Sequence, residues 1–175
     1  KQVHRCLLKQ KSKDWEWIIV DDCSNTTIKA SISTYFKKYD SFNIKLILND
    51  KKTTASECRN IGVDYASYNH LVFLDSDDII SEDFVSNRII EVEDFIVYKN
   101  FNLLDKDGNN TPAPSADSNY LNCFLQAKFI WQTTCVLWNK KFLIRIGKFN
   151  TQLKRLQDIE LSIRALILSS SYKVV

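Results

Sequence analysis

The stretch Leu71-Val72-Phe73-Leu74-Asp75-Ser76-Asp77-Asp78 decides the fold class, because an apolar run typical of a strand ends in a cluster of carboxylates. A second apolar run, within Trp15–Asp22, ends in the same way, and Ile44–Leu48 is a third strand candidate between them. Apolar residues at helical spacing over 28–39 and 55–66 separate these runs. This alternation with short connections predicts an α/β fold with a mostly parallel central sheet flanked by helices.

The rest of the chain continues the alternation, with one clear loop. Turn residues and two prolines indicate this loop over 105–117. Strands are expected over 95–101 and 133–138, and helices over 82–91, 119–127, 140–146 and 156–168.

Composition and charge exclude several classes of protein. The 175 residues are 45% hydrophobic and 26% charged, as in an ordinary soluble globular domain. A formal net charge of +3 is too balanced to favour nucleic acid as a partner. The apolar runs are too short to span a bilayer, although a weakly basic edge at Lys9, Lys11 and Lys13 leaves peripheral contact with an anionic membrane open.

The cysteines and the missing methionines bear on compartment and completeness. Five scattered cysteines without CxxC spacing indicate neither a zinc site nor a disulfide framework, which favours a reducing, cytoplasmic compartment. The sequence begins with Lys1 and contains no Met. We therefore expect a single domain over 1–175 from which residues are missing.

The acidic strand ends are the candidate functional residues, because ligands of open α/β sheets bind beyond the carboxyl ends of the strands. Asp75, Asp77 and Asp78 should repel one another and raise one another's pKa, which solvent, a helix cap or a divalent cation would relieve. Mg²⁺ and Mn²⁺ prefer such carboxylate oxygens together with substrate phosphates. The alternative is structural: Asp77 or Ser81 caps a helix that begins near Glu82.

Three further positions have both a structural and a functional interpretation. The pair Asp21-Asp22 either forms a turn before the next helix or binds a nucleobase or ribose. Arg59 either lies on a solvated helix face or balances phosphate charge. Asp158 either favours the start of the last helix through the helix dipole or acts as a general base.

His4 and His70 are expected to be ordinary surface or edge residues, and Trp131 and Trp138 either pack in the core or stack on sugars.

Three segments, in this order, resemble glycosyltransferase family 2, the inverting nucleotide-sugar enzymes of GT-A fold. Trp15–Ser24 resembles the family's second strand and loop. Cys58–Val63 followed by Leu71–Asp78 resembles its "ARNxG … FLDSDD" stretch, and a weaker similarity covers 131–168. The family's first strand has no counterpart before Lys1, Cys58 stands where Ala is usual, and Gln157 stands where Glu is frequent.

The resemblance implies a role for each candidate residue. Asp22 would contact the base of the nucleotide, commonly uridine, and Arg59 the phosphates or ribose. Asp75 would bind the ribose or donor sugar. Asp77 would ligate Mn²⁺ or Mg²⁺, and Asp158 would be the catalytic base for the acceptor hydroxyl.

The resemblance also implies a reaction and a division of labour. Residues 1–93 would hold the nucleotide sugar, most often a UDP-sugar, and 94–175 would face a glycan or glycolipid acceptor. The product would be a surface polysaccharide or glycolipid, made in the cytoplasm or at the inner face of the membrane. A non-catalytic nucleotide-sugar-binding or scaffolding domain is the alternative, and it would not need Asp158. A third hypothesis is another kind of Mg²⁺-dependent enzyme acting on phosphates, although no Gly-rich phosphate loop supports it.

Overall fold

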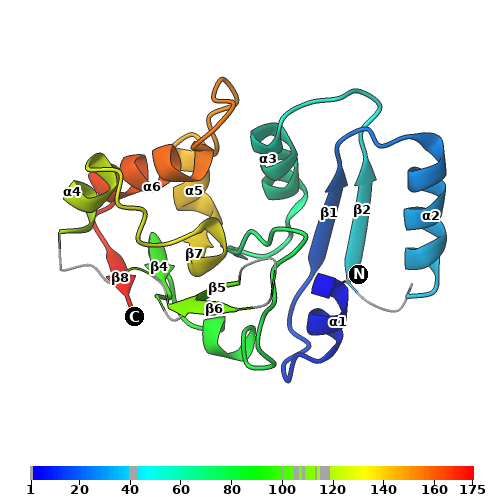
Figure 1. Cartoon of the computed structure of the whole chain (residues 1–175), viewed down its shortest axis with the longest axis horizontal. Coiled ribbons are helices and arrows are strands. Elements are labelled where there is room, and N and C mark those ends of the chain that lie inside the picture. The colour runs from blue at the N-terminus through cyan, green and yellow to red at the C-terminus, as the bar shows by residue number, and fades with distance from the viewer. Residues whose placement is uncertain are drawn as a thin grey trace.

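The computed structural model describes residues 2–39, 43–99, 101–104, 107, 109–112, 114 and 119–175. Helices and strands alternate over most of this length, and the described strands form three separate sheets, of two, four and two strands, with helices packed around the first two (Figure 1). Of the predicted loop over 105–117, the structure describes 107, 109–112 and 114. The loop prediction is wrong at 110–112, where β6 (Asn110–Pro112) forms an exposed antiparallel pair with β5 (Asn102–Leu104).

The first sheet pairs β1 (Trp17–Asp21) with β2 (Ile44–Leu48) in parallel, as the sequence predicts. Helix α2 (Thr26–Lys37) connects the two strands and begins where the side chain of Asn25 accepts the backbone N–H of Ile28. The short helix α1 (Gln2–Leu8) precedes β1 in the chain.

Helix α3 (Ala55–Tyr65) follows β2 and packs against β1. A reciprocal cap fixes its start. The hydroxyl of Thr54 accepts the backbone N–H of Glu57 at 3.1 Å, and the same hydroxyl donates to the Glu57 carboxylate. Val63 is the buried apolar residue of this helix, whereas Tyr65 is 57% exposed.

The second sheet has the order β3-β7-β4-β8 and is mixed. Strand β7 (Val136–Asn139) pairs antiparallel with both β3 (His70–Leu71) and β4 (Phe95–Val97), whereas β8 (Tyr172–Val174) pairs in parallel with β4. The α/β class is therefore confirmed. Within this sheet β3, β4 and β8 run in the same direction, and β7, which lies between β3 and β4, runs against them.

The helices of the second half cover this sheet. They are α4 (Tyr120–Leu125), α5 (Lys140–Arg145) and α6 (Gln157–Leu168), with short 3-10 turns at Ser86–Arg88 and Thr133–Cys135. The helix predicted over 82–91 is wrong: turns and the short 3-10 segment occupy this stretch.

The main core lies between these helices and the mixed sheet. Phe95, Trp138 and Phe142 stack within it, and each is 2% exposed. Trp131 is equally buried, and its indole N–H donates to the Ser162 hydroxyl at 3.1 Å. Trp131 and Trp138 are therefore core residues rather than sugar-stacking platforms.

A smaller aromatic cluster joins α1 to α2, and it corrects the expectation for His4. The His4 imidazole is fully buried, lies 5.6 Å from the Trp17 ring centroid, and its Nδ1 is 2.9 Å from the Tyr35 hydroxyl. Two of the lysines expected to form a basic edge also make local contacts. Lys11 pairs with Asp83, and Lys13 donates to backbone carbonyls.

Candidate functional site

The acidic turn after the 71–74 segment is organised around Asp78. The Asp78 carboxylate accepts the backbone N–H of Asp75 at 2.7 Å and the hydroxyl of Thr134 at 2.5 Å. Burial, together with the charges of Asp75 and Asp77, raises the pKa of Asp78. Asp78 thus folds the turn back on itself and anchors it to the second half of the chain, while Asp75 and Asp77 stay on its surface.

Arg59 meets this turn from α3. Its guanidinium lies 2.9 Å from the Asp75 carboxylate and 5.2 Å from the centroid of the Phe149 ring. The Arg59 side chain is 20% exposed and the Asp75 side chain 55% exposed, so the pair is accessible from one side. The two predicted donor-binding residues are therefore in direct contact.

The residue after Arg59 connects α3 to the segment that leads to Asp158. The Asn60 side-chain amide donates to the Phe149 carbonyl, and its oxygen accepts the Phe149 backbone N–H, both at 2.9 Å. These two hydrogen bonds fix the start of the segment that leads into α6, in which Asp158 is the second residue. Figure 1 shows that this stretch rises on the side of the molecule where β1 and β2 end.

The two aspartates after β1 have different partners. Asp21 is buried and accepts the backbone N–H of Ser24, which is the structural turn role. Asp22 accepts both the backbone N–H (2.6 Å) and the hydroxyl (2.8 Å) of Thr53, and Lys52 lies 3.3 Å away. These hydrogen bonds lower the pKa of Asp22 and keep it ionised.

Contacts connect Asp22 to the Arg59–Asp75 pair through one loop. Thr53, which binds Asp22, also lies 3.5 Å from the thiol of Cys58, the neighbour of Arg59. Asp22, Arg59 and Asp75 thus surround the first turns of α3. Asp158 joins them only indirectly, through Phe149.

The described residues leave the side-chain carboxylates of Asp77 and Asp158 without a hydrogen-bond partner. Within the same residues there is no group of three or more His, Cys, Asp or Glu side chains that could enclose a metal ion. A single exposed carboxylate still fits Mg²⁺ or Mn²⁺, since these ions are often held by one or two carboxylates plus water and substrate phosphates. Asp77 meets that requirement, and Asp158 fits a group that must accept a proton.

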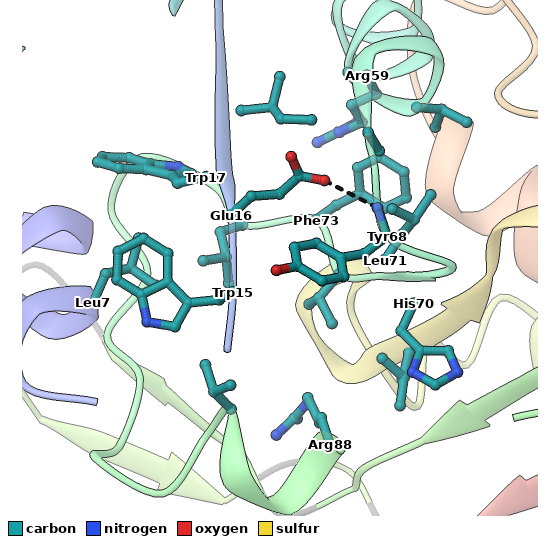
Figure 2. Close-up of a pocket in the computed structure, with 18 of the residues that line it drawn as sticks. Leu7, Trp15, Glu16, Trp17, Arg59, Tyr68, His70, Leu71, Phe73 and Arg88 are labelled. Atoms are coloured by element: carbon teal, nitrogen blue, oxygen red, sulfur yellow. Dashed lines mark hydrogen bonds between the residues drawn. The ribbon is translucent and has the colours of Figure 1, made fainter. Parts of the chain in front are cut away.

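A cavity of about 650 Å³ begins beside this site and extends along β1. Figure 2 shows Arg59 at one end and Arg88 at the other, with Trp17, Tyr68 and Phe73 between them. The end that contains Arg59, Cys58 and Asp75 belongs to the candidate site. At the opposite end the Arg88 guanidinium stacks on Phe84 and Tyr98, at 3.7 and 4.0 Å from the ring centroids.

Sequence reasoning missed the residues that hold the candidates in place. Thr53 could have been noted, because it directly precedes the Thr54-x-x-Glu57 capping signal. Asn60 and Asp78 lie inside stretches that the sequence singles out, but their partners Phe149 and Thr134 are 89 and 56 residues away. No local pattern predicts such pairings.

Comparison with known proteins decides the family. The sequence model of Glycosyl transferase family 2 matches residues 1–151, which is most of the chain and includes Asp22, Arg59, Asp75 and Asp77. The chain belongs to glycosyl transferase family 2. The resemblance recognised from its motifs is thereby confirmed.

Curated relatives of this family member include bacterial glycosyltransferases. The amylovoran biosynthesis glycosyltransferase AmsB of Erwinia amylovora is 29% identical over 91% of this chain and 57% of its own length. The UDP-Glc:alpha-D-GlcNAc-diphosphoundecaprenol beta-1,3-glucosyltransferase WfgD of Escherichia coli is 34% identical over 54% of this chain and 34% of its own length. The chain thus spans about half or less of the length of these relatives.

Solved structures confirm that the fold of this family 2 chain is GT-A. The crystal structure of S. aureus TarS 1-349 in complex with UDP superposes with a TM-score of 0.69, covering 99% of this chain and 53% of TarS at 20% identity. A structure of GalNAc-T7 with UDP, GalNAc and Mn²⁺ gives a TM-score of 0.63, covering 94% of this chain and 37% of GalNAc-T7 at 16% identity. In the described residues, no helix is both long and apolar enough to cross a membrane.

Proposed function

We propose that this protein is a metal-dependent, inverting glycosyltransferase that moves a sugar from a nucleotide diphosphate to an acceptor hydroxyl. The observation that carries the proposal is the contact between Arg59 and Asp75 at the first turns of α3, beside the loop that holds Asp22. Family membership and the GT-A fold support it.

The donor is proposed to be a UDP-sugar bound by the first half of the chain, residues 1–93. TarS has been crystallised with UDP, and the WfgD relative bears a UDP-glucose name. In this arrangement Asp22 contacts the base. Arg59 faces the phosphates or ribose, where a guanidinium can bind two oxygens at once, and Asp75 faces the ribose or donor sugar. Lys52, whose side chain is 78% exposed, adds a second positive charge near the nucleotide.

Asp77 would hold a Mn²⁺ or Mg²⁺ ion. Such a metal supplies Lewis-acid stabilisation of the diphosphate that leaves. The protein would contribute to metal binding by keeping the Asp77 carboxylate exposed and without a hydrogen bond, because Asp78 and not Asp77 accepts the hydrogen bonds of the turn.

Asp158 would accept the proton of the acceptor hydroxyl as that hydroxyl attacks the anomeric carbon from the face opposite the nucleotide. One displacement inverts the configuration and needs no covalent intermediate. Residues 94–175, which contain Asp158, would form the acceptor side. The acceptor is proposed to be a growing polysaccharide or lipid-linked glycan, which would place the protein in the cytoplasm, at or near the inner face of the membrane.

A product assay with labelled UDP-sugars and Mn²⁺ tests the function. We expect release of UDP and an inverted glycoside, loss of transfer in Asp158→Asn, and retained UDP binding in that variant. Asp83→Asn is the matched control, because this surface carboxylate pairs with Lys11 away from the site.

The two alternatives give different results. A non-catalytic binding domain would bind UDP-sugar with Mn²⁺ and show no turnover in either Asp158→Asn or the unmodified chain. A nucleotidyltransferase would release pyrophosphate instead of UDP. Unchanged transfer by Asp158→Asn would remove the base assignment.

A further inference from the structure

Arg164 of α6 binds the backbone of the segment that follows α5, residues 146–149. Its guanidinium donates to the carbonyls of Ile146 and Lys148, the latter at 2.8 Å. It also donates to both carboxylate oxygens of Glu160, one turn earlier on α6, at 2.7 and 2.6 Å. The Arg164 side chain is 21% exposed, and a planar guanidinium binds such a set of acceptors in one orientation. Arg164 therefore fixes α6 relative to the 146–149 segment.

The backbone of this segment is shaped to receive the guanidinium. The N–H groups of Gly147 and Lys148 donate to carbonyls in the last turn of α5, at 3.0 and 2.9 Å, which ends that helix. Gly147 has a φ of +92°, which favours glycine. A Cβ atom at this position would lie 3.5 Å from a guanidinium nitrogen of Arg164, so the guanidinium packs directly against the turn.

The same segment is also bound to α3, which carries Arg59. Asn60 binds both the N–H and the carbonyl of Phe149. The Phe149 ring lies under the Arg59 guanidinium, which pairs with Asp75. One continuous set of contacts therefore runs from α6 through the 146–149 segment to the donor side of the candidate site.

The first turn of α6, which carries Asp158, has no side-chain cap within the described residues. Helices α2, α3, α4 and α5 each begin at a residue whose side chain accepts a backbone N–H of the first turn. Helix α6 begins instead at Leu156, whose backbone is left-handed at a φ of 59° and whose side chain is 57% exposed. Apolar packing along α6 is not directional, so the hydrogen bonds of Arg164 are suited to set where Asp158 lies.

We propose that Arg164 is a positioning residue for Asp158, which it holds in place relative to the bound donor. The inference rests on the proposed function, in which Asp158 accepts the proton of the acceptor hydroxyl. Arg164 follows Asp158 by six residues, or about 9 Å along the helix axis, so it acts through α6 and not by touching the substrate. A general base must lie within hydrogen-bond reach of its proton, and a displacement of about 1 Å can lower the rate roughly 100-fold.

The kinetics of Arg164→Met test this role. Methionine keeps part of the apolar stem and loses every hydrogen bond of the guanidinium. We expect kcat for sugar transfer to fall roughly 10- to 100-fold, because the base is displaced. The Kd for UDP with Mn²⁺ should stay within about twofold, because Arg59 keeps its own contacts. Arg164→Lys keeps the charge and one donor, so its kcat should be intermediate.

Arg145→Met is the matched control. It removes an arginine from the neighbouring helix α5, where Arg145 pairs with Asp94 at 3.0 Å and not with the 146–149 segment. We expect kcat to be unchanged in this variant. An equal fall in kcat for Arg145→Met and Arg164→Met would overturn the proposal, since any lost arginine would then have the same effect.

A double variant separates the positioning of Asp158 from a general structural role. If Arg164 acts through Asp158, Arg164→Met should not lower the residual transfer of Asp158→Asn any further. A loss of the same size in both backgrounds would contradict the positioning role. So would a loss of UDP affinity as large as the loss in kcat.

Hydrogen exchange at the Phe149 amide tests the contact without requiring sugar transfer. This N–H is donated to Asn60, and Arg164→Met should speed its exchange at least roughly tenfold, whereas Arg145→Met should not. Arg164→Lys gives the same comparison where Arg164→Met does not fold. Unchanged exchange would sink the proposal. Faster exchange in a protein whose unmodified form transfers no sugar would instead overturn the proposed function and the base role of Asp158, and leave the contact between α6 and α3 in place.

Discussion

The guanidinium of Arg59 lies 2.9 Å from the carboxylate of Asp75, and this ion pair joins α3 to the acidic turn. Phe149 lies under the same guanidinium, at 5.2 Å from its ring centroid. The ring comes from the segment that leads to Asp158, so three distant stretches of the chain meet at one side chain. A change at Arg59 therefore alters contacts with both the acidic turn and the segment that leads to Asp158.

Arg59→Lys should weaken donor binding with little effect on stability. A lysine keeps the charge but loses the planar fork and its contact with the Phe149 ring. Partly exposed ion pairs contribute only about 0–1 kcal/mol to stability, whereas hydrogen bonds to charged groups contribute about 1.5–3 kcal/mol to binding. We expect the Kd for UDP with Mn²⁺, measured by calorimetry, to rise roughly 10- to 100-fold.

Lys148→Ala is the control for this comparison. Lys148 pairs with Asp64 at 2.8 Å on the surface, so its removal should change neither UDP binding nor the melting temperature appreciably. A similar loss of affinity in both variants would indicate a general charge effect rather than a site.

Asp78→Ala should loosen the acidic turn and weaken Mn²⁺-dependent UDP binding, although Asp78 is not assigned to the ligand itself. Asn at this position can still accept both hydrogen bonds, so Asp78→Asn should retain most of the affinity. Burial raises the pKa of Asp78 above its ordinary value of 3.8, so stability falls as the pH rises from about that value, where the unfolded chain ionises first, to the higher pKa of the folded chain. The stability of Asp78→Asn relative to the unmodified chain should therefore increase from pH 4 to neutral pH, as measured by urea unfolding. Equal losses of UDP binding in both variants would contradict the positioning role.

Asn60→Asp should distinguish the contribution of the Asp158 side of the site from that of the donor side. Aspartate can accept the Phe149 N–H but cannot donate to the Phe149 carbonyl, and an unsatisfied partner costs about 1–3 kcal/mol. We expect a lower kcat, since the altered contact leads to Asp158, and a smaller loss of UDP affinity than in Arg59→Lys, because Phe149 also lies under the Arg59 guanidinium. A change in UDP affinity alone would show that the contact serves the donor side.

The buried His4 predicts acid sensitivity. Burial lowers the pKa of His4 from 6.5, so above pH 6.5 the imidazole is neutral in both states and its contribution to stability is complete. Below pH 6.5 the unfolded chain takes up the proton first, and stability falls until the pH reaches the lower folded pKa. His4→Phe should flatten this part of the stability profile, as measured by urea unfolding at several pH values.

Gly62→Ala should stabilise the 175-residue chain by about 1 kcal/mol, because alanine is the better helix residue and its Cβ meets open space. For a chain of this length that corresponds to a rise of roughly 2–4 °C in the melting temperature. A fall in the melting temperature would mean that a neighbouring atom already occupies this side of α3.

Much of the fold follows from local pattern. The apolar run at 15–20 with its acidic end, the capped helices after Asn25 and Thr54, and the periodic run over 157–168 are each encoded within a few residues. The helix predicted over 82–91 failed because turns formed there instead, and the mixed second sheet was not predictable because β7 inserts between strands far from it in sequence.

Residue type and short spacing were enough to predict the family, the α/β class and the candidate carboxylates. Which of these carboxylates have partners became known from the folded arrangement. Asp21 and Asp78 take structural hydrogen bonds, Asp75 pairs with Arg59, and the carboxylates of Asp77 and Asp158 have no hydrogen-bond partner among the described residues. The physical reason is that these assignments depend on partners such as Thr134 and Phe149, which chain folding brings near from 56 to 89 residues away.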